Sequence, residues 1–201
     1  MHHLHTISSK NLSFSDLKKI LSENTLLTLS QDAIKKIKNC REYLDKKLEA
    51  TSEPIYGINT GFGSLYNKNI PKDKLEKLQE NLVMSHACGM GAEVPQEIVR
   101  LMLFLKIQSL SYGYSGVQVD TVERLIAMFN KNLLPKIYEM GSLGASGDLA
   151  PLAHLSLPLP ARGCVYEQPV RPPLAVAFLC RAHCHPVCSL AERDGDVVSV
   201  V

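Results

Sequence analysis

The sequence has almost no net charge and no long apolar run. Its 201 residues include 22 Lys and Arg against 20 Asp and Glu, a formal charge of +2 at pH 7. A balance so near zero indicates neither a nucleic-acid partner nor an anionic membrane surface. The longest apolar stretches, such as residues 101–105, are far shorter than a membrane span, and the N-terminus lacks a signal-peptide core. We therefore expect a cytoplasmic protein.

Cysteine is scarce where a disulfide framework would need it. Only Cys40 and Cys88, of six cysteines, precede residue 160, which is too few for the paired pattern of a secreted domain. We expect both to be buried thiols. The length suits one domain with a substantial core better than two.

Lysine disappears from the last quarter of the chain. Residues 1–157 contain fifteen Lys and three Arg, whereas residues 158–201 contain no Lys and four Arg, together with four of the six Cys and six of the eleven Pro. Such a shift in composition marks a different kind of sequence. We predict a helical domain over residues 1–159 and an unrelated, poorly ordered tail, rich in Pro, Cys and Arg, over residues 160–201.

Four segments have the apolar spacing of helices. Ser30 is a suitable N-cap for the first, which runs to about residue 50. Its apolar face is made by residues three and four positions apart, namely Ala33, Ile34, Ile37, Tyr43, Leu44 and Leu48. The other helices are predicted over about 72–87, 95–114 and 119–132. With one short strand near residues 24–29, the fold class is mainly α.

A glycine-rich segment, PIYGINTGFGSLYN, lies between the first two helices at residues 54–67. Gly57, Gly61 and Gly63 interrupt any regular period, which indicates a loop with unusual backbone conformations. From the residues alone, Tyr56 is a loop aromatic that packs on the core.

A second glycine-rich segment, GSLGASGDLAPLAH, runs from residue 141 to 154 into a predicted helix. Such loops can hold phosphate, but Asp148 would place a carboxylate against that ligand. A nucleophile elbow is excluded because Gly147 follows Ser146 directly. Spacing alone favours a helix start, with Asp148 as the N-cap and Gly147 supplying the bend.

Backbone cyclisation is another interpretation of the tripeptide at residues 145–147. Attack of the Gly147 nitrogen on the Ala145 carbonyl would close a five-membered ring, and loss of two waters would leave a methylidene group conjugated to an imidazolone. Gly147 has no Cβ to block closure, Ala145 is small, and Ser146 can lose its hydroxyl. The product would be an electrophile, which no ordinary side chain supplies. A helix beginning near Asp148 would favour negative charge on the ring.

Three segments together resemble the aromatic amino acid ammonia-lyase family. They are YGINTGFGSL from residue 56, NLVMSHACGMGAEVP from residue 81 and GSLGASGDLAPLAHLSLPL from residue 141. The resemblance covers about residues 10–159, the N-terminal third of that family's chain, and implies the N-terminal helical domain of its fold. It also implies that Ala145, Ser146 and Gly147 form 4-methylidene-imidazol-5-one (MIO), with no external cofactor.

The resemblance assigns roles in the glycine-rich loop. Tyr56 matches the tyrosine taken to remove the substrate's β-proton. Because an unperturbed phenol has a pKa of about 10, the site would have to lower that value or supply an assisting charge. Gly57, Gly61 and Gly63 would let the loop close as a lid.

The second segment carries the specificity that the resemblance implies. His86 matches a histidine beside the substrate's side chain, and imidazole facing imidazole can exchange a hydrogen bond, whereas selectivity for phenylalanine calls for an apolar residue there. L-histidine is therefore the favoured substrate and tyrosine the runner-up, so a tyrosine or phenylalanine ammonia-lyase stays an alternative. From its position alone, His86 is a histidine near a helix end, beside a turn at residues 88–89. Asp148 matches the family's Asp next to the ring and otherwise only caps the helix. His154 is assigned to packing or helix support.

No metal site is predicted. The stretch MHHLH places His2, His3 and His5 at a mobile terminus without a partner. The stretch CRAHCHPVC, residues 180–188, has enough ligands for one zinc ion but lacks a second paired knuckle.

The reaction implied by the resemblance is elimination of ammonia from the amino acid L-histidine to give trans-urocanate. The family forms homotetramers whose sites combine several subunits, and its later segment, with further site residues, has no counterpart in this sequence. The second hypothesis is therefore a non-catalytic fragment, and we expect little or no activity from this chain alone. A hydrolase that uses Ser146 is the third.

Overall fold

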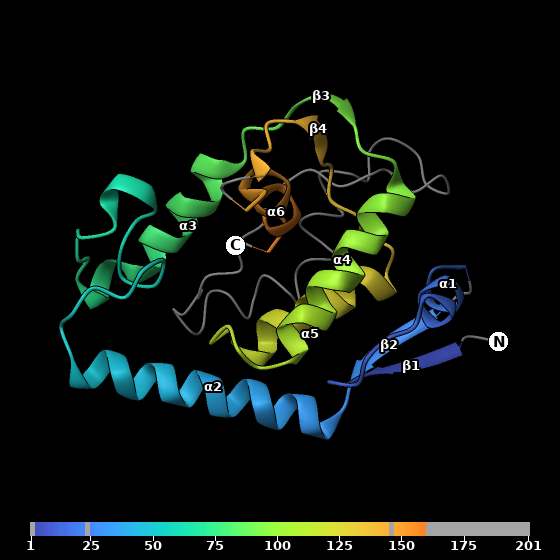
Figure 1. The fold of residues 1–201 in the computed structure, drawn as a ribbon, viewed down its shortest axis with the longest axis horizontal. Coiled ribbons are helices and arrows are strands. Elements are labelled where there is room, and N and C mark those ends of the chain that lie inside the picture. Colours follow the sequence, from blue (N-terminus) through green and yellow to red (C-terminus); the bar gives the residue numbers. More distant parts are fainter. Residues whose placement is uncertain (1–2, 23–24, 145–146, 160–201) are drawn as a thin grey trace, which may run out of the picture. The chain divides into compact units, whose positions relative to one another are not determined.

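The computed structural model describes residues 3–22, 25–144 and 147–159 (Figure 1). These residues form two compact units. The first unit comprises residues up to 53 and residues 95–134, and the second comprises residues 54–94 and the described residues from 135 onward. Ala145, Ser146 and the tail over 160–201 lie outside the described residues. The boundary between a domain and an unrelated tail after residue 159 therefore stays a prediction.

The described residues of the first unit form two strands and four helices. They are β1 (His3–Ile7), α1 (Phe14–Ser22), β2 (Thr25–Leu29), α2 (Gln31–Ala50), α4 (Gln96–Ser111) and α5 (Val119–Asn130). The strand near residues 24–29 is thus confirmed. It pairs in parallel with β1, so that His3 lies opposite Thr25 and Ile7 opposite Leu29. The expectation of a mobile terminus is wrong for His3 and His5, because they belong to a paired strand; Met1 and His2 lie outside the described residues.

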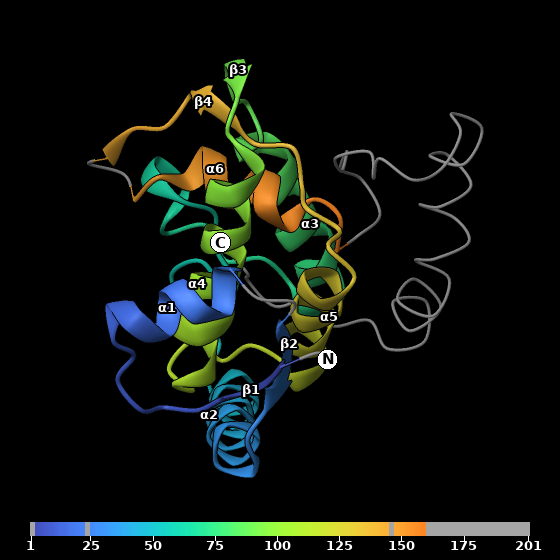
Figure 2. The same ribbon diagram turned by 90° about the vertical axis from the view of Figure 1, so that its right-hand side faces the viewer.

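The core of the first unit lies between α4, α5 and β2. Val99, Leu103, Phe104 and Ile107 of α4 are fully buried, as are Val122, Leu125 and Phe129 of α5. Figure 2 shows α1 lying against α4. Asn130, the last residue of α5, bridges the helix to the edge strand β2. Its Oδ1 accepts the Leu27 N–H at 2.7 Å and its Nδ2 donates to the Leu27 carbonyl at 2.9 Å.

The predicted helix from Ser30 to about residue 50 is confirmed as α2. Ser30 is its N-cap, and the Ser30 hydroxyl accepts the Ala33 N–H at 3.2 Å. Ala33, Ile37 and Leu44 are buried, but Tyr43 is 67% exposed, which corrects its place on the apolar face. The buried stripe is narrow, and Tyr43 is turned from its neighbour Leu44 by about 100° around the helix.

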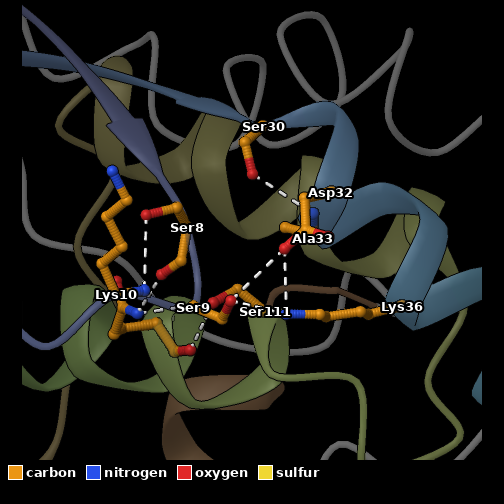
Figure 3. Close-up of polar contacts among 9 residues, drawn as sticks. Ser8, Ser9, Lys10, Ser30, Asp32, Ala33, Lys36 and Ser111 are labelled. Carbon is orange, nitrogen blue, oxygen red and sulfur yellow. Dashed lines mark hydrogen bonds and ion pairs between the residues drawn. The ribbon is translucent and has the colours of Figure 1, made fainter.

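Polar contacts tie the segment after β1 to two helices of the first unit (Figure 3). The Lys36 ammonium donates to the Ser9 hydroxyl at 2.6 Å and lies 2.9 Å from the Asp32 carboxylate. On α4, the amide of buried Gln108 donates to the Ser8 carbonyl at 2.7 Å. These bonds position the chain between β1 and α1.

The second unit contains two helices and a small antiparallel pair of strands. They are α3 (Leu75–His86), β3 (Met90–Glu93), β4 (Tyr138–Met140) and α6 (Leu149–Ser156), with 3-10 turns at Gly63–Leu65 and Lys72–Lys74. In both views α6 lies beside α3 (Figures 1 and 2). Met90 pairs with Met140 in the strands, and Glu93 forms a 2.7 Å ion pair with Lys136.

The predicted helices over 72–87, 95–114 and 119–132 correspond to α3, α4 and α5, so the mainly helical fold class is confirmed. Both cysteines of the described ranges are less buried than expected, since Cys40 is partly buried and Cys88 is exposed. No helix in those ranges combines the length and apolar character needed to cross a bilayer.

Candidate active site

The base of the glycine-rich loop is attached to α3 by one buried amide. Gln79, only 5% exposed, donates from Nε2 to the carbonyl oxygens of Gly57 and Ile58, each at 3.0 Å. Because a buried amide needs partners, these two bonds hold the loop against the helix. Gln79 was not among the site residues predicted from the sequence. The available signal was a polar residue between Leu78 and Leu82 on a face expected to be apolar.

Two further buried polar residues shape the loop from inside. The Asn59 side-chain oxygen accepts the Ile55 N–H at 2.6 Å. The Thr60 hydroxyl accepts the Gly57 N–H at 3.2 Å and donates to the Gly61 carbonyl at 3.0 Å. Because these bonds satisfy backbone groups that no helix or strand serves, the loop has one defined conformation at its base.

Three aromatic rings follow one another from the loop to the end of α3. The Tyr56 and Phe62 ring centroids are 5.6 Å apart, and those of Phe62 and His86 are 5.4 Å apart at an interplanar angle of 73°. Tyr56 is 61% exposed, so its ring does not pack in the core as the residues alone indicated. Its phenol oxygen accepts the Gly63 N–H at 3.3 Å. The loop thus places Tyr56 at the surface, at one end of the row of three rings whose other end is His86.

The His86 ring is oriented by its own helix. Its Nδ1 lies 2.7 Å from the Leu82 carbonyl oxygen, and 3.2 Å from the Ser85 hydroxyl. A carbonyl oxygen can only accept, so Nδ1 carries a proton and donates it. In the neutral ring Nε2 is therefore an acceptor.

The signature segment makes a tight turn before α6. The Gly147 N–H donates to the Gly144 carbonyl at 3.2 Å, and Gly147 has a φ of +87°, which favours glycine. A Cβ added to Gly144 or Gly147 would meet nothing within 4 Å. The backbone on both sides of residues 145 and 146 is therefore folded back on itself and uncrowded.

Asp148 stands immediately before α6, which confirms the predicted helix start. Its side chain does not cap the helix, which corrects that role. The residue is in the left-handed region, with φ 55° and ψ 44°, and its carboxylate accepts a hydrogen bond from the Ser142 hydroxyl instead. Capping needs an extended backbone at this position, and the left-handed conformation turns the carboxylate away.

All described candidate residues of the site lie in the second unit, which brings the loop, α3 and the signature segment into one body. Within the residues that the structure covers, no group of three or more His, Cys, Asp or Glu side chains is arranged to hold a metal ion. The CRAHCHPVC stretch lies outside them.

Comparison with known proteins identifies the family. The family described as "Aromatic amino acid lyase" matches residues 12–196. The chain belongs to this family. The resemblance of the three segments is thereby confirmed, and the family is one that acts on amino acids and uses MIO.

Curated relatives with high identity are histidine ammonia-lyases. The protein from Legionella pneumophila (strain Corby) is 48% identical over 157 residues, which are 78% of this chain and 31% of that protein. The one from Deinococcus radiodurans is 44% identical over 167 residues, 83% of this chain and 32% of that protein. The chain thus spans about a third of the length of the curated relatives it matches.

Solved structures of the ammonia-lyases and aminomutases have the same fold. Histidine ammonia-lyase from Trypanosoma cruzi matches with a TM-score of 0.70 and 32% identity, covering 82% of this chain and 30% of that one. Tyrosine aminomutase from Streptomyces globisporus matches with a TM-score of 0.77 and 30% identity, covering 89% and 33%. The expected N-terminal helical part of this fold is therefore confirmed.

Proposed function

We propose that this chain carries the electrophile-forming and proton-removing part of a site that eliminates ammonia from L-histidine to give trans-urocanate. The observation that supports this most is the presence, in one unit, of the glycine turn at residues 144–147 and the row of Tyr56, Phe62 and His86. The identity of 48% to a histidine ammonia-lyase supports the choice of substrate.

The residues around the tripeptide fit the prosthetic group of the family. Ring closure needs a nitrogen on a permissive backbone with space around it, and Gly147 offers both. Formed from Ala145, Ser146 and Gly147, MIO would supply the electrophile that turns the substrate's amino group into a leaving group. Asp148 supports this part of the site by bonding to Ser142 across the turn.

Tyr56 is the proposed base for the β-proton. Its hydroxyl is exposed, and the Gly63 N–H points at the oxygen where negative charge develops when the proton leaves. Gly57 and Gly63 have positive φ values of 71° and 56°. Gly57 is held at the base by Gln79 and Thr60, so Gly61 and Gly63 are the proposed flexible points of a lid. The fixed base at Gln79 and the exposed outer half suit a loop that moves about a hinge.

His86 is the proposed specificity residue. Its Nδ1–H is occupied by the Leu82 carbonyl, so Nε2 is left to accept a hydrogen bond from the imidazole of the substrate. Tyrosine or phenylalanine would leave that acceptor without an equivalent N–H donor, which disfavours them.

Intact-mass analysis of the purified chain tests the proposal. We expect a deficit of two water molecules located in the peptide that contains residues 145–147. The variant Ser146→Ala, which has no hydroxyl to eliminate, is the matched control and should not form the methylidene. The full expected mass in the wild-type chain would overturn the proposal.

A second candidate is a chain without catalytic activity of its own. The observation in its favour is that the chain spans 31% of the length of its relative from Legionella pneumophila. Urocanate absorbance after addition of L-histidine distinguishes the two. A mass deficit with a flat absorbance trace would indicate a site that forms its electrophile but does not turn over substrate.

A further inference from the structure

One histidine of the second unit joins α6 to the turn that follows α3. His154 of α6 accepts the Gly89 N–H on its Nε2 at 2.9 Å, and its ring stands edge-on to Tyr138 with centroids 5.3 Å apart. Gly89 comes three residues after His86, and His154 comes seven residues after Gly147. The bond therefore connects the segments that carry the proposed specificity residue and the proposed electrophile.

The other end of the signature segment contacts the same turn. A Cβ on Gly141 would lie 3.0 Å from the Gly89 Cα and 3.2 Å from the Cys88 oxygen. A Cβ on Gly89 would lie 2.9 Å from the His154 Nε2. In the turn at residues 88–89, here called the clamp turn, Gly89 thus lies between Gly141 and His154. The Cys88 N–H donates to the His86 carbonyl at 2.9 Å, so the clamp turn is fixed directly to His86.

The direction of the bond defines the protonation state of His154. A backbone N–H can only donate, so Nε2 must present a lone pair and the ring proton must be on Nδ1. In a ring protonated on both nitrogens, the Nε2–H of His154 would face the Gly89 N–H, and no hydrogen bond could form between the two donors. Tyr138 on β4 is the titratable group whose ring contacts His154, and Cys88 precedes the bonded Gly89 in the chain. Partial burial lowers the pKa of His154 below its ordinary value of 6.5, in the direction that keeps the ring neutral.

We propose that His154 is a positioning residue which, as a neutral imidazole protonated on Nδ1, holds the clamp turn after His86 to the helix after Gly147. By this bond it sets the two parts of the site at a fixed separation. The positioning role rests on the proposed function. The hydrogen bond and the tautomer of His154 do not depend on it.

Nuclear magnetic resonance of the full chain tests the bond itself. With ¹⁵N-labelled histidine, two-bond proton–nitrogen correlations report which ring nitrogen carries the proton, and His154→Gln assigns the signals. At a pH well above 6.5 we expect the Nδ1–H tautomer, and on acidification the Gly89 amide should shift with the same midpoint as the His154 ring. A ring protonated on Nε2, or a Gly89 amide that ignores the titration, would overturn the proposal.

Three variants test the positioning role. His154→Phe keeps a ring against Tyr138 but removes the acceptor, whereas His154→Gln retains an acceptor that does not titrate. His5→Phe is the matched control, because His5 also makes an edge-on ring contact, with Phe104, but belongs to the first unit. The readout is the fraction of freshly expressed chain that lacks two water molecules.

We expect His154→Phe to lower that fraction about tenfold, which corresponds to about 1.4 kcal/mol, and His154→Gln and His5→Phe to leave it near the wild-type value. Equal fractions in all four proteins would refute the positioning role. If His154→Phe does not fold, His154→Gln and the tautomer measurement still test the proposed role of His154. A wild-type chain of full mass would refute the proposed function, while the tautomer measurement would separately decide the His154–Gly89 bond.

Discussion

Replacing Gln79 with leucine should detach the glycine-rich loop from α3. Leucine has a similar volume, so the substitution removes the amide without opening a large cavity. The wild-type amide donates to two carbonyl oxygens at 3.0 Å from a side chain that is only 5% exposed. Loss of two such bonds, with both oxygens left without a donor, should lower the free energy of unfolding by about 2 to 4 kcal/mol.

Two measurements separate this effect from a general loss of packing. Chemical denaturation gives the change in the free energy of unfolding, and hydrogen exchange should show faster exchange of the Gly57 amide, which donates to Thr60 at the loop base. Gln96→Leu, at an exposed position in α4, is the control and should change the stability by less than about 0.5 kcal/mol. If Gln79→Leu behaves like the control and the Gly57 amide stays protected, the loop is held by something other than Gln79.

Three further substitutions or conditions have expected outcomes. Ser30→Ala removes the N-cap bond of α2 and should cost about 1 kcal/mol of unfolding free energy; an unchanged denaturation midpoint would contradict the capping role. Arg100→Met removes hydrogen bonds to the Phe129 carbonyl and to Asn132, and a cation–π contact in which the guanidinium carbon lies 3.8 Å from the Phe129 ring centroid. The substitution should lower the free energy of unfolding by about 2 to 3 kcal/mol in the same assay, and Arg41→Met should lower it by less. Because burial lowers the folded-state pKa of His154, its contribution to the free energy of unfolding is complete above pH 6.5 and is lost as the pH falls through the folded-state pKa. His154→Gln should therefore flatten the dependence of the unfolding free energy on pH in denaturation curves. If the variant keeps the pH dependence of the wild type, that dependence belongs to other groups such as His5, whose pKa is also lowered by burial.

The fold and the site differ in how far the sequence alone could predict them. Periodicity is local information, so the spacing of apolar residues predicted α2, α3, α4 and α5 and placed the N-cap of α2 at Ser30. It did not predict β1, whose partner strand begins at Thr25, because strand pairing depends on which distant backbone is available. The exposure of Tyr43 was likewise decided by the width of the surface that α2 covers.

For the candidate site, too, the sequence indicated some features and only the structure showed others. The motifs by themselves indicated the family. The resemblance that they carry implied the candidate MIO tripeptide at residues 145–147 and the candidate roles of Tyr56 and His86. Only the tertiary structure showed that Gln79 holds the loop and that His154 meets Gly89, 65 positions away in the chain. A buried hydrogen bond between distant residues leaves no period in the sequence, since its donor and acceptor meet only after the elements between them have packed.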